Sequence, residues 1–248
     1  MFHSMFRISA AAIFLTLVVC LPFKMVFAGD SAEKHFNLGN EYIAKKDYDK
    51  AIAEFTEAIK ISPKSSAPYF NRGHAYEGKN DHDRAISDYT KSISIDPKDA
   101  SAYYSRGLAY ERKMDFDKAI ADYTRAIKTD PKFVWGYTNR GQLYAKGKKD
   151  YKRAIADFTQ AVRIDPKEAV AYYNMGSAYG DLKDYKKAIV NYTEAIRINQ
   201  SYAEAYDNRG LAYMKLGDKA NGCRDFASAC KLGLCKIAQS AKSKGDCK

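Results

Sequence analysis

The chain has 248 residues, of which 46% are hydrophobic and 29% are charged, and it contains 15 glycines and 6 prolines. This is the composition of a globular protein, which excludes wholesale disorder and a collagen-like fold. The 41 lysines and arginines exceed the 30 aspartates and glutamates, giving a formal net charge of +11. The 20 tyrosines are many for this length, and their regular recurrence indicates the fold.

The first 28 residues are typical of a secretory signal peptide. A short basic start over residues 1–7 precedes a nearly continuous apolar run over residues 8–21. Val26, Phe27 and Ala28 then fit the cleavage site of a signal peptidase. We expect cleavage after Ala28 and export to the periplasm or out of the cell, with membrane contact only through the leader.

Two other uses of this leader are less favoured. An uncleaved membrane anchor needs about 20 apolar residues, and Pro22 and Lys24 interrupt the run before that length. Lipid attachment at Cys20 would make the chain a lipoprotein, but the residues before this cysteine match a lipobox poorly.

Beyond residue 31 one pattern recurs six times. A glycine returns at steps of 34 or 35 residues, at Gly39, Gly73, Gly107, Gly141, Gly176 and Gly210. A tyrosine stands three residues after each glycine, at Tyr42, Tyr76, Tyr110, Tyr144, Tyr179 and Tyr213. Another aromatic residue recurs later in each unit, at Phe55, Tyr89, Tyr123, Phe158, Tyr192 and Phe226.

The spacing predicts a pair of helices in each unit. In the second unit Ala85, Tyr89 and Ile93 fall at helical intervals, and Pro97 then ends the helix. A glycine inside a helix costs about 1 kcal/mol relative to alanine, so its recurrence indicates that two helices pack closely. We expect each glycine to face a small alanine of the second helix. An aspartate at each predicted turn can cap that second helix: Asp47, Asp81, Asp115, Asp150, Asp184 and Asp218.

This pattern resembles the 34-residue motif of the tetratricopeptide repeat family, which carries glycine, tyrosine, alanine, aromatic, alanine and proline at these offsets. A single unit cannot bury its apolar face, so neighbouring units stack. The resemblance implies an all-α, right-handed superhelical solenoid of six hairpins plus a C-terminal capping helix, with a concave groove lined by the first helices. The expected units are 32–65, 66–99, 100–133, 134–168, 169–202 and 203–236, followed by a cap over 237–248.

Four cysteines lie near the C-terminus, which in an exported chain indicates two disulfides. Cys223 and Cys230 are seven residues apart on one predicted helix, about 10.5 Å, and this exceeds disulfide reach. A terminal helix over about 236–244 that runs antiparallel predicts the pairs Cys230–Cys235 and Cys223–Cys247. A four-cysteine zinc site is the alternative, but no CxxC pair is present, and we expect no metal.

The resemblance also implies which residues face the groove. Two residues before the glycine, five of the six units carry asparagine: Asn37, Asn71, Asn139, Asn174 and Asn208. The row resembles the asparagine ladders with which some superhelices of this family hold extended polypeptide, because an amide bonds both N–H and C=O of a passing backbone. Alternatively, each asparagine bonds only the neighbouring repeat. The pattern of a carboxylate clamp is not matched, because Phe36, Ser101 and Ser105 stand where cations are needed.

Aromatic and polar residues are the other groove candidates. Three residues before the glycine stand Phe36, Phe70, Tyr104 and Tyr173, which supply apolar contacts if they face the groove and belong to the core if they lie between helices. His74 and Gln142, just after the glycine, would add polar contacts.

An arginine immediately before the glycine coincides with an aspartate in the second helix. The coincidence holds in all four units that have the arginine and predicts four helix-to-helix ion pairs with a structural role: Arg72–Asp88, Arg106–Asp122, Arg140–Asp157 and Arg209–Asp225.

Catalysis finds little support, because the three histidines after the leader stand at different repeat offsets and no phosphate-binding or metalloprotease motif is present. We expect a non-enzymatic protein–protein interaction scaffold of the cell envelope that takes no cofactor and binds an extended peptide or partner segment in its groove. Acids interspersed with the basic residues argue against nucleic acid as the partner. The alternatives are a structural subunit of an envelope complex that uses its convex face or edges, and a binder of anionic envelope polymers through the basic tail over 215–248.

Overall fold

The computed structural model describes residues 28–247, with side chains from residue 31 onward. The predicted leader therefore lies outside the described residues except for Ala28. The described part consists of helices and contains no strand. No helix within it is both long and apolar enough to cross a bilayer.

Six helical hairpins follow one another and form an all-α repeat solenoid. The first helices are α1 (Ala28–Ala44), α3 (Ser66–Gly78), α5 (Ala100–Arg112), α7 (Val134–Gln142), α9 (Ala169–Asp181) and α11 (Ala203–Lys215). The second helices are α2 (Tyr48–Ile61), α4 (His82–Ile95), α6 (Phe116–Thr129), α8 (Tyr151–Ile164), α10 (Tyr185–Ile198) and α12 (Lys219–Lys231). A short last helix, α13 (Lys236–Ser243), packs on α12.

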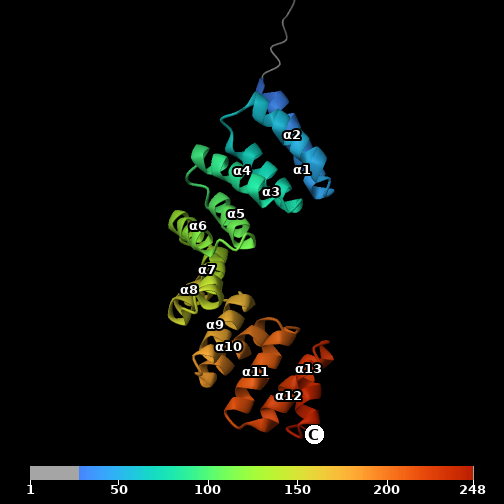
Figure 1. Cartoon of the computed structure of the whole chain (residues 1–248), viewed down its shortest axis with the longest axis vertical. Helices are drawn as coiled ribbons and strands as arrows, with labels where there is room; N and C mark the ends of the chain where they lie inside the picture. Colours follow the sequence, from blue (N-terminus) through green and yellow to red (C-terminus); the bar gives the residue numbers. More distant parts are fainter. Residues whose placement is uncertain (1–27, 248) are drawn as a thin grey trace, which may run out of the picture.

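The stack is curved (Figure 1). Each helix packs against the helices that precede and follow it in the chain, and most first helices also contact the first helix of the next hairpin. In the middle of the stack α6 and α8 lie on the outer side of the bend, and α5 and α7 lie nearer the inside (Figure 1). In this part of the stack the first helices therefore lie nearer the inner face.

The turn inside each hairpin has one geometry. The aspartate before every second helix accepts a hydrogen bond from a backbone N–H three residues later, as Asp81 does from Arg84 at 3.1 Å. The residue before that aspartate has positive φ, 59° for Asn80 and 82° for Gly217. These six aspartates are N-caps in the structure.

The fourth unit, 134–168, is one residue longer than the others, and the structure accommodates this residue at the end of its first helix, before the turn. Helix α7 continues into a π-helical turn, Leu143–Gly147, in which the Lys148 N–H donates to the Leu143 carbonyl at 3.1 Å. Asp150 still caps α8 from its usual place. The insertion thus widens the end of the first helix and leaves the turn unchanged.

The expectation that each repeated glycine faces an alanine is incomplete, because the nearest neighbour of each is the aromatic ring of the second helix. The alanine backbone is also close at two of them: a Cβ on Gly73 would lie 3.3 Å from the Ala85 carbonyl oxygen, and one on Gly176 would lie 3.2 Å from that of Ala188. A Cβ on Gly107 would lie 2.7 Å from Tyr123 Cε1, and one on Gly141 would lie 2.7 Å from Phe158 Cε1. Both rings are fully buried. Glycine is needed because the large ring lies directly against the helix backbone.

Candidate functional site

Four arginines hydrogen-bond to the second helix of their own hairpin and also to the preceding hairpin. Arg106 donates to both carboxylate oxygens of Asp122, at 2.8 Å each, and to the Thr90 hydroxyl of the preceding unit at 3.0 Å. The other arginines make the same contacts, in the sets Arg72–Asp88–Thr56, Arg140–Asp157–Thr124 and Arg209–Asp225–Thr193.

These ion pairs are largely enclosed by the solenoid. The Asp122 side chain is 7% exposed and that of Arg106 is 17% exposed. Hydrogen bonding to the aspartate raises the pKa of Arg106, whereas burial raises the pKa of Asp157 despite the opposing effect of Arg140. The threonine contact was missed from the sequence, although threonine recurs there at Thr56, Thr90, Thr124, Thr159 and Thr193.

Three of the five candidate groove asparagines hydrogen-bond to the preceding repeat. The Asn71 amide donates to Asn40 Oδ1 at 2.7 Å. The Asn139 and Asn208 amides donate to the hydroxyls of Tyr104 and Tyr173, at 3.2 and 2.9 Å. One donor of each amide is therefore used within the solenoid.

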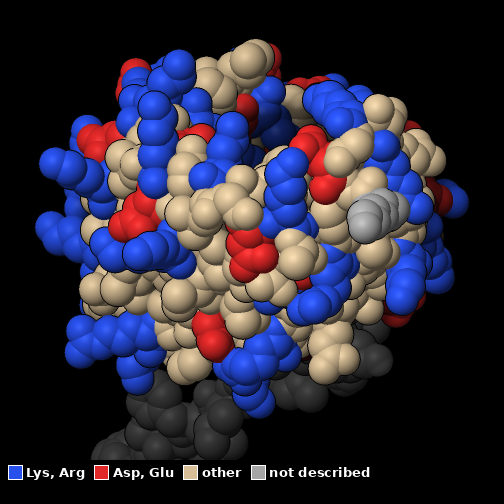
Figure 2. All heavy atoms as spheres, turned by 90° about the horizontal axis from the view of Figure 1, so that it is seen from below, with Lys and Arg blue, Asp and Glu red and all other residues tan. Residues whose placement is uncertain are grey.

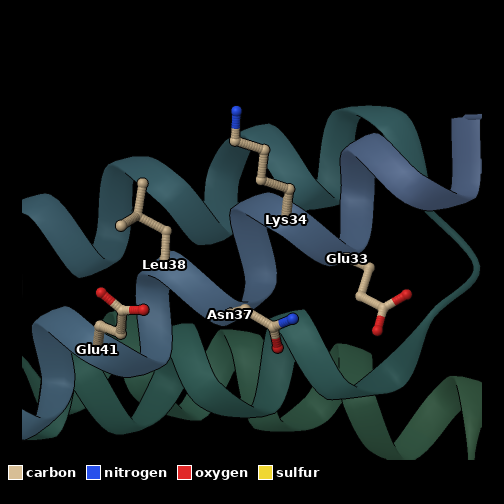
Figure 3. Close-up of a pocket in the computed structure, with 5 residues that line it drawn as sticks. All are labelled: Glu33, Lys34, Asn37, Leu38 and Glu41. Atoms are coloured by element: carbon tan, nitrogen blue, oxygen red, sulfur yellow. The ribbon is translucent and has the colours of Figure 1, made fainter. Parts of the chain in front are cut away.

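The other two asparagines have different surroundings. Asn174 is buried, and its amide nitrogen has no hydrogen-bond partner within the described residues. Asn37 is exposed at the end of the stack and lines a cavity of about 480 Å³. There Asn37 lies on the same side of α1 as Glu33 and Glu41, with Lys34 and Leu38 pointing away from them (Figure 3).

The candidate groove aromatics lie partly in the core. Each is half-buried and packs against the aromatic ring of its own second helix. The pairs, with ring-centroid distances of 5.6–5.9 Å, are Phe36–Phe55, Phe70–Tyr89, Tyr104–Tyr123 and Tyr173–Tyr192. In the sixth unit Asp207 takes this position, and its burial raises its pKa to about 6.

An aromatic cluster with one exposed member lies where the third and fourth units meet, and sequence reasoning missed that member. Trp135, the single tryptophan of the chain, is 58% exposed on α7. Its ring lies 5.9 Å from that of Phe133 and 6.5 Å from that of Tyr104, between centroids. Asn139 bonds the hydroxyl of the same Tyr104. No other unit has a tryptophan at the position of Trp135, so the repeat pattern does not mark this residue. The one hint in the sequence is that the single tryptophan lies on a predicted first helix.

Of the two polar candidates, Gln142 is half-buried and His74 is exposed. His74 lines a cavity of about 280 Å³ between the second and third units, together with Glu77 and Arg112. The buried Glu77 carboxylate contacts both Arg112 and the His82 ring. This cluster fixes α3 against α5.

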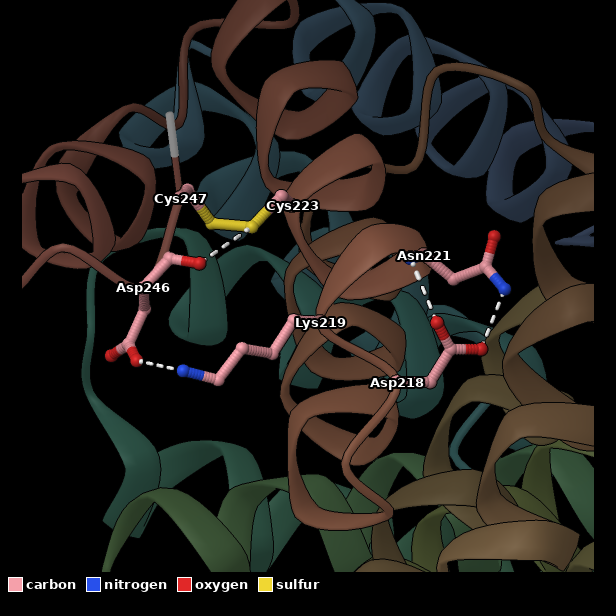
Figure 4. Close-up of a disulfide and its surroundings, with 6 residues drawn as sticks. All are labelled: Asp218, Lys219, Asn221, Cys223, Asp246 and Cys247. Atoms are coloured by element: carbon pink, nitrogen blue, oxygen red, sulfur yellow. Dashed lines mark hydrogen bonds and ion pairs between the residues drawn. A yellow bond between two sulfur atoms is a disulfide. The ribbon is translucent and has the colours of Figure 1, made fainter.

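The structure pairs the four terminal cysteines two by two. Cys223 on α12 is joined to Cys247, with Cα atoms 5.6 Å apart, and Cys230 to Cys235, with Cα atoms 4.0 Å apart. Figure 4 shows the first pair beside Asp246, whose carboxylate is held by Lys219 at 2.9 Å. The bridges tie the segment that contains α13 to α12, and their formation in the protein stays a prediction.

Comparison with family models decides the family. A TPR repeat model matches residues 39–80, 78–113, 148–183 and 178–217, and tetratricopeptide repeat models match 100–133 and 203–232. The chain belongs to the tetratricopeptide repeat family. Repeats of this family generally form non-enzymatic protein–protein interaction scaffolds.

Solved structures share this TPR fold at low sequence identity. YrrB, described as a TPR protein with an unusual peptide-binding site, is 21% identical and superposes with a TM-score of 0.65 over 76% of this chain and 97% of its own. Pseudomonas aeruginosa pilF is 14% identical, with a TM-score of 0.74 over 88% of this chain and 99% of its own. A tetratricopeptide repeat protein from Parabacteroides merdae is 21% identical, with a TM-score of 0.69 over 87% and 89%. No curated protein sequence matches the chain significantly.

Proposed function

We propose that this TPR chain binds an extended segment of a partner protein along the face of its first helices, centred on Trp135. The observation that carries the proposal is the exposure of large apolar side chains on that face. Trp135 and Val170 occupy equivalent positions on α7 and α9, and they are 58% and 40% exposed. Leu211 on α11 is 41% exposed. Exposed tryptophan next to tyrosine is typical of the residues that dominate binding energy in interfaces.

The asparagines supply polar contacts for a bound backbone. Asn71, Asn139 and Asn208 each use an amide N–H within the solenoid. Each amide group has two donors and a carbonyl acceptor, so each keeps a second N–H and an oxygen for a ligand. The bonds to the preceding repeat hold the amides in place and reduce the entropy that binding would cost.

The dimensions of the face favour an extended peptide. Packed helices lie about 10 Å apart, and an extended chain advances about 3.3 Å per residue. Each repeat therefore spans about three peptide residues, and the face from α5 to α11 spans about ten. The printed description of YrrB as a peptide-binding TPR protein supports the same mode.

Replacement of Trp135 with alanine tests the proposal. The ligands are peptides of about ten residues, selected from a random phage-displayed library for binding to the wild-type chain. Their affinity for Trp135→Ala should be roughly tenfold or more lower than for the wild type, because hot-spot aromatics contribute about 2 kcal/mol or more. Val190→Ala is the matched control, since Val190 is 62% exposed on the second helix α10. Titration by fluorescence anisotropy measures both variants. Unchanged binding by Trp135→Ala, or loss of binding by Val190→Ala, would move the site away from the first helices.

We also propose that this scaffold is located in the cell envelope. The leader sequence and the paired cysteines support this location. The chain recovered from an envelope fraction should begin at Gly29 and carry its four remaining cysteines as Cys223–Cys247 and Cys230–Cys235, because disulfides persist in exported proteins. Intact-mass measurement and non-reducing peptide mapping check both points. An intact leader or four free thiols would contradict export in this form.

A further inference from the structure

A large cavity lies between the sixth hairpin and the terminal helix. It has a volume of about 610 Å³ and is lined by α11, α12 and α13. Its floor is apolar, formed by Met214, Phe226 and Ile237. This volume lies within the range of about 300–1,000 Å³ that is typical of ligand-binding pockets.

A departure from the repeat coincides with this cap cavity. The residue that opens the second helix has a ring in the first five units, at Tyr48, His82, Phe116, Tyr151 and Tyr185. In the sixth unit Lys219 stands there, and its ammonium group pairs with Asp246. The corresponding cavity between α9 and α11, which Tyr185 lines, measures about 340 Å³.

The rim of the cap cavity is positively charged. Lys215, Lys236 and Lys244 line it and are exposed. In residues 31–247 no carboxylate forms an ion pair with any of these three lysines. Seen from the C-terminal end, lysine and arginine side chains are numerous around the edge of the molecule, and a few acidic side chains lie among the uncharged ones in the middle (Figure 2).

The three aspartates of the tail over residues 215–248 are already engaged. Asp246 pairs with Lys219, Asp225 pairs with Arg209, and Asp218 caps α12. The cavity therefore presents an apolar floor under uncompensated positive charge. Such a site is complementary to a ligand that combines an apolar group with negative charges.

We propose that the cap cavity binds an acidic segment of the polypeptide partner, in which one large apolar side chain is flanked by aspartates or glutamates. The apolar side chain enters above Met214, Phe226 and Ile237, and the carboxylates face the three lysines. This inference rests on the proposed function and names the chemistry of one end of the partner. Leu211 and Lys215 line both this cavity and its neighbour between α9 and α11, so a segment bound along the first helices continues into it.

The probe is a short synthetic peptide with one phenylalanine between runs of aspartate, titrated against the full chain. The triple variant Lys215→Glu, Lys236→Glu, Lys244→Glu should weaken binding at least tenfold, and salt at about 0.5 M should weaken it in the wild type by screening. The matched control is Lys91→Glu, Lys128→Glu, Lys186→Glu, which reverses three exposed lysines on second helices and should bind as the wild type does.

Peptide analogues and a floor variant test the apolar part. Exchange of the phenylalanine for alanine, or Ile237→Ser in the protein, should each weaken binding several-fold. The methyl NMR signal of Met214 should shift on addition of the wild-type probe. Equal binding of the alanine analogue, an unmoved Met214 signal, or binding to anionic phospholipid vesicles in place of the peptide would overturn the proposal.

The Trp135→Ala variant separates this inference from the proposed function. It should bind the acidic probe normally while losing the peptides selected on the groove. If the acidic probe fails to bind the wild type while the selected peptides bind through Trp135, the cap proposal fails and the groove proposal stands.

Discussion

Replacing Asp122 with alanine should lower the free energy of unfolding by about 3 kcal/mol, measured by urea denaturation. The Arg106 side chain, which is 17% exposed in the wild type, would lose both hydrogen bonds to the carboxylate. Removal of one partner from a buried pair typically costs about 3–5 kcal/mol. The lower end applies because Arg106 keeps its Thr90 contact and some access to water.

Asp117→Ala is the control for this prediction. Asp117 lies on the same helix and pairs with Lys148 at 2.7 Å, but its side chain is 81% exposed. Exposed pairs contribute about 0–1 kcal/mol, so this variant should be nearly as stable as the wild type. Equal stability of both variants would show that the Arg106–Asp122 pair does not hold the hairpin.

Phe158→Ala should destabilise the solenoid by about 3–5 kcal/mol, because a fully buried ring would be lost and a cavity left behind. Phe158 packs directly on Gly141 of its own unit and belongs to one cluster with Met175 and Ala178 of the next. The loss should therefore loosen the contact between the fourth and fifth units as well as the fourth hairpin.

Hydrogen exchange followed by mass spectrometry locates this effect. Amides of residues 134–202 should exchange faster in Phe158→Ala, whereas those of α1 and α2 should change least, since each unit contacts mainly its neighbours. Val190→Ala should leave the pattern unchanged, because truncation of an exposed side chain usually changes stability by less than about 0.5 kcal/mol. A uniform increase along the chain would indicate a single cooperative unit instead of a stack.

The recurring residues made most of the fold predictable from the sequence. Glycine, aromatic and capping aspartate at a fixed spacing specify hairpins because each has one steric or hydrogen-bonding role. Periodicity places a residue on a face of a helix but does not identify the side chain that it meets. For this reason Gly107 was matched with an alanine, although it packs against Tyr123.

The candidate site was less predictable because binding residues differ between units. The Arg–Asp pairs could be proposed because the two residue types occur together, and the structure brings each pair into contact. Trp135 occurs once, so no repetition marks it. The cap cavity is lined by Lys219, which is a single departure from an otherwise aromatic position, so no repetition marks this cavity either.

The most direct measurement of the central claim is the fluorescence of Trp135, because it is the single tryptophan of the chain and is 58% exposed. A peptide bound along the first helices should cover the ring, shift its emission to shorter wavelength and protect it from acrylamide quenching. A selected peptide that binds tightly without changing the emission or the quenching would contradict binding at this face.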